Sequence, residues 1–215
     1  MTFIQDGTTP ATLLGVESNK AARSVIVPRG QQFVIAEQTG TIAAALTANS
    51  SVFAMRLDPG SALRAFIDAI ELRWTTVVAF TTPVTAGRRL AIYRGSGAAA
   101  SGGTAIATCA PKSTGFSASE FDAASGGDAR IASTGALTVT GITFEAAPLA
   151  LMPLVHLGAA GAYAEAEYHF DRSDGGPIQL EPGQLIAVRN PVAMDAAGTW
   201  QLGVEVHWRE AAQLL

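Results

Sequence analysis

The residues best suited to chemistry lie in one short stretch of this sequence, Tyr163 to Asp171, which reads Tyr-Ala-Glu-Ala-Glu-Tyr-His-Phe-Asp. Carboxylates and imidazoles bind divalent metals, and on a strand Glu165, Glu167, His169 and Asp171 would share one face. Alternate side chains on a strand are about 6.6–7 Å apart, however, which is too far for several to reach one ion. Glu165, Glu167 and His169 are therefore weak metal candidates, and we expect a solvated or interface-facing polar edge instead.

Other reactive residue types occur without the neighbours that catalysis needs. The single cysteine, Cys109, has no local nucleophile signature and excludes an intrachain disulfide framework, so we expect a small buried side chain. The serines form no Gly-x-Ser-x-Gly elbow, and the glycines form neither a phosphate loop nor a dinucleotide fingerprint. Glycosidase carboxylates are not recognisable from sequence, because the fold sets their separation, but three Trp and three Tyr offer little surface for stacking sugars. We predict a chain that is not an enzyme and that needs no cofactor.

The elements that would position these residues are mostly strands. The clearest prediction covers residues 200–208, where Trp200, Leu202, Val204, Val206 and Trp208 alternate with polar or small residues over nine positions. Residues 63–74 fit either a helix or a strand, and the β-branched residues that follow favour one long, bent strand over 63–80. The other predicted strands cover 24–28, 32–36, 41–46, 51–57, 88–94, 137–144, 149–157, 163–170, 178–180 and 185–189.

Two regions depart from this pattern. Residues 1–23 are polar and small, which indicates an N-terminal arm, and residues 95–136 are rich in Gly, Ala and Ser. The second region predicts a long loop insertion with one short helix at 117–124, which Ser117 would cap and in which Glu120 lies three residues on. Many strands joined by Pro and Gly turns predict an all-β fold, a jelly-roll or β-sandwich, formed as a single domain by residues 24–215.

Composition narrows the classes of function. The chain is 48% hydrophobic and only 15% charged, so its surface is expected either to be unusually rich in Ser, Thr, Gly and Ala or to be partly buried against other subunits. Its net charge is −4, and no run of Lys and Arg could neutralise a phosphate backbone, which argues against nucleic-acid binding. No apolar stretch approaches the roughly 20 residues of a membrane-spanning helix, and the N-terminus does not read as a signal peptide. We therefore expect a protein that is made and kept in the cytosol, or assembled there into something larger.

Three segments stand out toward the C-terminus: residues 178–191, which read Ile-Gln-Leu-Glu-Pro-Gly-Gln-Leu-Ile-Ala-Val-Arg-Asn-Pro, residues 196–208, and residues 128–138. These segments carry a resemblance to structural proteins of tailed bacteriophages. It implies a small β domain on the virion, a jelly-roll subunit that serves as a capsid cement or decoration protein or as part of a fibre. It transfers no catalytic residues.

Three hypotheses follow. The first is a virion structural protein that stabilises the phage head through contacts with the major capsid protein or other virion proteins, as a homo-oligomer, here a trimer. The arm at 1–23 and the loop at 95–136 would make those contacts. The alternative is a receptor- or carbohydrate-binding β domain of a head or tail fibre. The third is a cupin-like metalloprotein that uses Glu165, Glu167 and His169.

Overall fold

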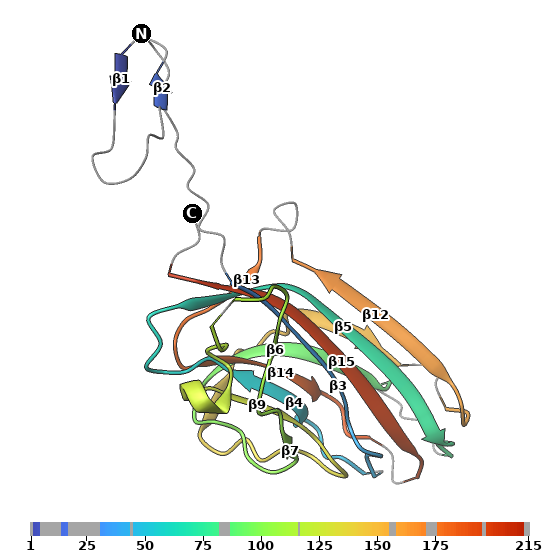
Figure 1. Ribbon diagram of the computed structural model, residues 1–215. Helices are drawn as coiled ribbons and strands as arrows, with labels where there is room; N and C mark the ends of the chain where they lie inside the picture. The colour runs from blue at the N-terminus through green and yellow to red at the C-terminus, as the bar shows by residue number, and fades with distance from the viewer. Residues whose placement is uncertain are drawn as a thin grey trace.

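The computed structural model describes residues 2–4, 14–16, 31–43, 45–81, 87–115, 117–154, 158–170, 176–194 and 197–212, with side chains from residue 31 onward. Two antiparallel sheets lie face to face (Figure 1). The six-stranded sheet has the order β12-β5-β15-β3-β8, and β13 also pairs with β5. Its strands are β3 (Gln31–Gln38), β5 (Arg64–Val78), β8 (Ala110–Pro111), β12 (Tyr163–His169), β13 (Ile178–Leu180) and β15 (Thr199–Ala211).

The seven-stranded sheet has the order β10-β6-β14-β4-β9-β7, and β11 also pairs with β6. Its strands are β4 (Ser50–Arg56), β6 (Arg89–Gly97), β7 (Thr104–Ala105), β9 (Asp128–Ile131), β10 (Ile142–Phe144), β11 (Ala150–Pro153) and β14 (Gln184–Asn190). A separate pair joins β1 (Thr2–Ile4) to β2 (Leu14–Val16). The chain therefore forms a β-sandwich, which confirms the predicted all-β class, while the jelly-roll topology stays a prediction.

Strand β15 shows why this sequence folds as a sandwich. Buried and partly exposed residues alternate along its whole length, because successive side chains of a strand point to opposite faces of the sheet. The predicted apolar face from Trp200 to Trp208 is confirmed as buried. β15 lies between β5 and β3, so its alternation fixes which face of three neighbouring strands meets the core.

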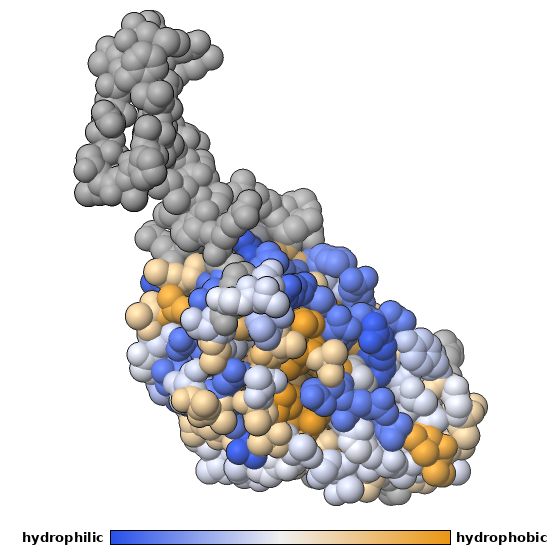
Figure 2. Space-filling view, viewed as in Figure 1, coloured by the Kyte–Doolittle hydropathy of each residue, from blue (hydrophilic) through white to orange (hydrophobic). Residues whose placement is uncertain are grey.

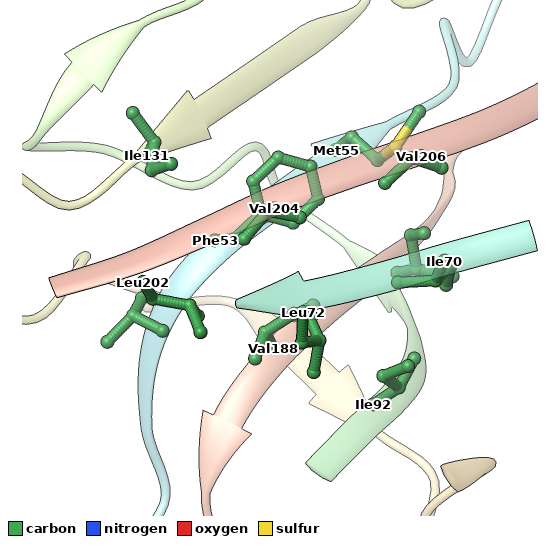
Figure 3. Packing of buried hydrophobic residues seen from close by; sticks show 14 of the residues in the cluster. Phe53, Met55, Ile70, Leu72, Ile92, Ile131, Val188, Leu202, Val204 and Val206 are labelled. Atoms are coloured by element: carbon green, nitrogen blue, oxygen red, sulfur yellow. The ribbon is translucent and has the colours of Figure 1, made fainter. Parts of the chain in front are cut away.

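The core fills the space between the two sheets. Figure 3 shows side chains from both layers pointing toward one another, among them Phe53, Ile92 and Val188 from one sheet and Leu72 and Val204 from the other. Such burial stabilises the fold by about 1.5–3 kcal/mol for each large apolar side chain.

Indole rings extend this core toward one end of the six-stranded sheet. Trp74 and Trp200 stack with ring centroids 4.3 Å apart. The Trp74 indole N–H donates to Thr76 Oγ1 at 2.9 Å, so this polar atom is satisfied although it is buried.

The uncertain segment at 63–80 is a strand. β5 runs from Arg64 to Val78 and pairs with β12, β13 and β15. The pairing with β15 shifts register between His207 and Trp208, which gives β5 an irregularity where the sequence predicted a bend. β5 forms a strand rather than a helix because its backbone is paired on both edges. A helix with the same apolar residues would leave the facing backbone groups of β12 and β15 without partners.

Two predicted strands are wrong in extent. In place of a strand over 41–46, only Ile42 forms a bridge, to Trp200, and Ala45 adopts a left-handed conformation (φ 65°) that ends extended backbone. In place of a strand over 137–144, β10 begins at Ile142, because Gly141 turns the chain with φ 79°.

The region 95–136 is only partly a loop. It contains the end of β6, the short strands β7 and β8, and β9, which pairs with β4 inside the seven-stranded sheet. The helix expected at 117–124 is a single 3-10 turn, Ala123–Ser125, whose N-cap is Asp122 and which has no side-chain cap, so the predicted role of Ser117 is wrong. The predicted strand at 24–28 and most of the arm at 1–23 lie outside the described residues.

Candidate functional site

The three weak metal candidates lie on the outer face of the six-stranded sheet. Along β12, Glu165, Glu167 and His169 are exposed together with Tyr163, as the alternation predicts, whereas Ala164, Ala166 and Tyr168 are only partly exposed and pack toward the core. His169 Nε2 lies 2.9 Å from Glu167 Oε1, so the two side chains satisfy each other. Asp171 lies outside the described residues.

The neighbouring strands do not complete a metal site with them. Strand β5 lies beside β12 and places Arg73 opposite Glu165, a cation where a ligand would be needed. His207, on β15, is one strand further away and contacts Glu205 at 2.7 Å. Across the described parts of the chain, no group of three or more His, Cys, Asp or Glu side chains is arranged to hold a metal ion.

Arg73 is the centre of a charged cluster on this face. Its guanidinium contacts Glu71 on the same strand, lies 3.4 Å from Glu205 Oε2 on β15, and lies 3.9 Å from Glu165 Oε1 on β12. We call these four residues the Arg73 cluster. Three carboxylates around one guanidinium link three adjacent strands across the sheet.

Two carboxyl groups of the Arg73 cluster have pKa values that move in opposite directions. A hydrogen bond to Glu165 raises the pKa of Glu71, and partial burial raises it further. The pKa of Glu165 is lowered, first because the Tyr163 hydroxyl donates to its Oε2 at 2.6 Å and then by the contact with Glu71. Glu71 is therefore the member of the pair that keeps a proton to higher pH.

Most other charges described on this face are also paired. Arg209 on β15 donates to both carboxylate oxygens of Asp68 on β5, with distances of 2.8 to 3.2 Å. In the space-filling view, hydrophilic residues follow the side of the molecule along which β12 and β5 run (Figure 2). The described part of this face is thus a polar surface on which most charged groups bind one another.

Beside the Arg73 cluster the same face is hollowed by a shallow groove of about 350 Å³. Gly203 on β15 pairs with Arg73 on one side and Gln38 on the other, and its missing side chain opens the groove between them. Side chains from four strands line it, including Gln38, Arg73, Thr75, Tyr163, Gln201 and Glu205. We call this hollow the Gly203 groove; sequence reasoning missed it because it depends on strand register.

A smaller hollow of about 290 Å³ lies on the seven-stranded sheet. Arg94 contacts Glu145 there at 2.6 Å, and Phe144 pairs with Gly95, where a Cβ atom would lie only 2.9 Å from the Phe144 ring. The Arg189 guanidinium lies 3.9 Å from the centroid of the same ring. The aromatic and cationic groups beside this hollow therefore already contact each other.

Cys109 is a buried side chain, as its sequence context predicts. It is 2% exposed, and burial raises the pKa of its thiol far above the ordinary value, so the nucleophilic thiolate is disfavoured. Its backbone N–H donates to Asp122 Oδ1 at 2.7 Å, and Asp122 Oδ2 accepts from the Ser119 N–H at 3.2 Å.

A second buried carboxylate, that of Glu210, completes this cluster. Glu210 is 3% exposed and accepts hydrogen bonds from Ser119 Oγ at 2.6 Å, Trp208 Nε1 at 2.9 Å and the Glu120 N–H at 3.0 Å. We call Cys109, Ser119, Asp122 and Glu210 the Glu210 cluster. The sequence contained a signal for this cluster. The alternation that buries Trp200 to Trp208 also places Glu210, two residues after Trp208, on the core face.

Comparison of the sequence with known protein families gives no match, and comparison with curated proteins gives none either. Within the described residues, no helix has the length and apolar character needed to cross a bilayer.

Proposed function

We propose that this chain is a structural subunit of a bacteriophage virion, a cement or decoration protein that stabilises the head through protein–protein contacts. The observation that carries the proposal is the self-pairing of the polar groups on the broad face of the six-stranded sheet. A face of this kind offers a rigid, extended surface for a neighbouring subunit and has no convergent catalytic group.

The distribution of the large apolar side chains supports the same proposal. Most of those that the structure describes, including all three tryptophans, fill the core between the sheets. The low charge of the sequence and its resemblance to tailed-phage structural proteins add to this support. The partner is the major capsid protein or another virion protein, and the subunit acts as a homo-oligomer, a trimer.

The metalloprotein hypothesis receives less support, since Glu165, Glu167 and His169 are spread along one exposed strand and two of them pair with each other. Titrating purified protein with Zn²⁺ or Mn²⁺ tests it directly: a rise in the unfolding temperature that is lost in Glu165→Gln and His169→Ala would restore this hypothesis.

Mass spectrometry of purified phage particles tests the virion proposal. We expect the chain in the particles at a copy number that matches the sites of a capsid lattice. Particles of a phage in which the gene is deleted should release their DNA at a lower temperature than wild-type particles. Adding purified protein to them should restore the wild-type release temperature. Absence of the chain from the particles, or only a few copies at a fibre tip, would overturn the cement role.

A further inference from the structure

The Gly203 groove is open because of a glycine that the fold does not require. The φ angle of Gly203 is not in the left-handed region. A Cβ atom built there would make ordinary contacts with Arg73, 3.4 Å from Cβ and 3.7 Å from the carbonyl oxygen. At Gly97, by contrast, a Cβ atom would lie 2.2 Å from a backbone oxygen. A glycine inside a strand weakens it, and where conformation does not require one it often marks a place where a ligand approaches the backbone.

The walls of the groove carry planar polar groups. The Gln38 amide donates to Gln201 Oε1 at 3.0 Å, and the Gln201 amide donates to Thr41 Oγ1 at 3.3 Å, so both amides are held in place and keep further donor and acceptor capacity. Thr75 adds a hydroxyl group. Such fixed amide and hydroxyl groups suit a ligand that carries several hydroxyl groups of its own.

An aromatic ring borders the same groove. Tyr163 is 53% exposed, and its hydroxyl donates to Glu165, which fixes the position of the ring before any ligand arrives. A ring held in this way loses little entropy on binding and offers a flat surface for the C–H face of a sugar.

The charged groups at the groove favour a neutral ligand over an anionic one. The guanidinium of Arg73, the only one among the residues that line the groove, already contacts the carboxylates of Glu71, Glu165 and Glu205, so three carboxylates share one cation there. An anionic sugar would meet this excess of carboxylates without a cation available to bind it.

We propose that the Gly203 groove binds a short neutral oligosaccharide, with the amides of Gln38 and Gln201 bonding its hydroxyl groups and the Tyr163 ring packing on one sugar face. The inference goes beyond the virion proposal and does not depend on it. Because the groove is shallow, we expect a dissociation constant of about 1 mM for one site.

The test is an NMR titration of the purified, isotope-labelled chain with maltotriose, cellotriose and chitotriose, and with sialyllactose as the anionic comparison. We expect at least one neutral trisaccharide to cause saturable shifts at the amides of Gly203 and Gln38, and sialyllactose to bind more weakly.

Two groove variants and one matched control sharpen the result. Gly203→Ala fills the floor and should weaken binding at least about fivefold without lowering the urea midpoint, because alanine fits this backbone. Tyr163→Ala removes an exposed ring and should weaken binding similarly. Gly135→Ala makes the same chemical change where a Cβ atom would meet nothing within 4 Å, and should leave binding unchanged.

Absence of saturable shifts with every neutral trisaccharide would overturn the proposal. So would shifts that persist unchanged in Gly203→Ala and Tyr163→Ala, or tighter binding of sialyllactose. Particle mass spectrometry can succeed or fail independently of this titration, so failure of the groove and failure of the virion role are distinguishable.

Discussion

The Arg73 cluster and the Glu210 cluster are both built around carboxylates, and they lie on opposite faces of the six-stranded sheet. Around Arg73 the carboxylates are partly exposed, and water can replace any partner that is lost. Around Glu210 the groups are buried, and each donor depends on one acceptor. Exposed ion pairs contribute little to stability, whereas breaking a buried network leaves desolvated groups unpaired.

The two clusters therefore have different roles: one forms part of the surface, and the other anchors a segment of the chain to the core. The Arg73 cluster shapes a face that is available to other molecules. The Glu210 cluster joins the segment around Ser119 to β15 and so holds part of the region 95–136 against the sandwich. Stability measurements on single variants should separate these roles, and the pH dependence should do so independently.

The largest effect is expected for Glu210→Ala. It removes the acceptor of Ser119 Oγ, Trp208 Nε1 and the Glu120 N–H, and should lower the free energy of unfolding by about 3 kcal/mol, measured by urea denaturation. Glu205→Ala on the outer face of the same strand is the control and should cost less than about 1 kcal/mol. Equal losses would show that burial does not separate the two clusters.

Asp122→Ala should have the next largest effect. It leaves the backbone N–H groups of Cys109 and Ser119 without their acceptor and should cost about 2 kcal/mol. Hydrogen exchange should speed up at those two amides before it changes elsewhere. Glu145→Ala, which removes an exposed partner of Arg94, is the control and should leave both amides protected.

The pH dependence should reverse the usual behaviour of a carboxylate. Burial raises the pKa of Glu210, so its folded pKa lies above the unfolded value and the ionised form is the one that folding disfavours. The stabilising contribution is complete below the unfolded pKa and is lost as pH rises through the folded pKa. Relative to Glu210→Gln, the wild type should therefore gain stability as the pH falls from neutral toward the unfolded pKa of a glutamate, about 4.3, as followed by urea midpoints. A relative loss of stability over this range would mean that the hydrogen bonds from Ser119, Trp208 and Glu120 to the carboxylate outweigh its burial.

The smallest effect is expected for Arg73→Ala. The ion pairs on the outer face are worth less than about 1 kcal/mol in total at physiological salt, and the loss should shrink further at about 1 M salt. Thermal unfolding at the two salt concentrations measures it. A salt-independent loss as large as that of Glu210→Ala would place Arg73 in the structural core of the fold.

Strands were predicted correctly from the sequence where the pattern of apolar and polar residues lies within the strand itself. The alternation of β15 is complete within its own residues, so both its extent and its buried face were readable. The strand at 41–46 failed because a left-handed residue, Ala45, interrupts it, and alanine gives no warning of that conformation.

The candidate site was less readable because it depends on pairing between distant strands. The exposure of Glu165, Glu167 and His169 could be predicted from the alternation of polar and apolar residues along a single strand. Their contacts did not, since the register between β12, β5 and β15 decides that Glu165 lies opposite Arg73. The Gly203 groove requires the same register across four strands, which no pattern within one strand contains.

The central position of β15 also has a consequence for how the chain is made. Thr39 and Leu202, which are joined by a hydrogen bond, lie 163 positions apart in the sequence. During synthesis β3 and β5 therefore leave the ribosome long before the strand that must lie between them, and until then their apolar faces and unpaired backbone edges stay exposed. We expect slow folding and a need for chaperones during this interval, and a nascent chain stalled before residue 199 should aggregate.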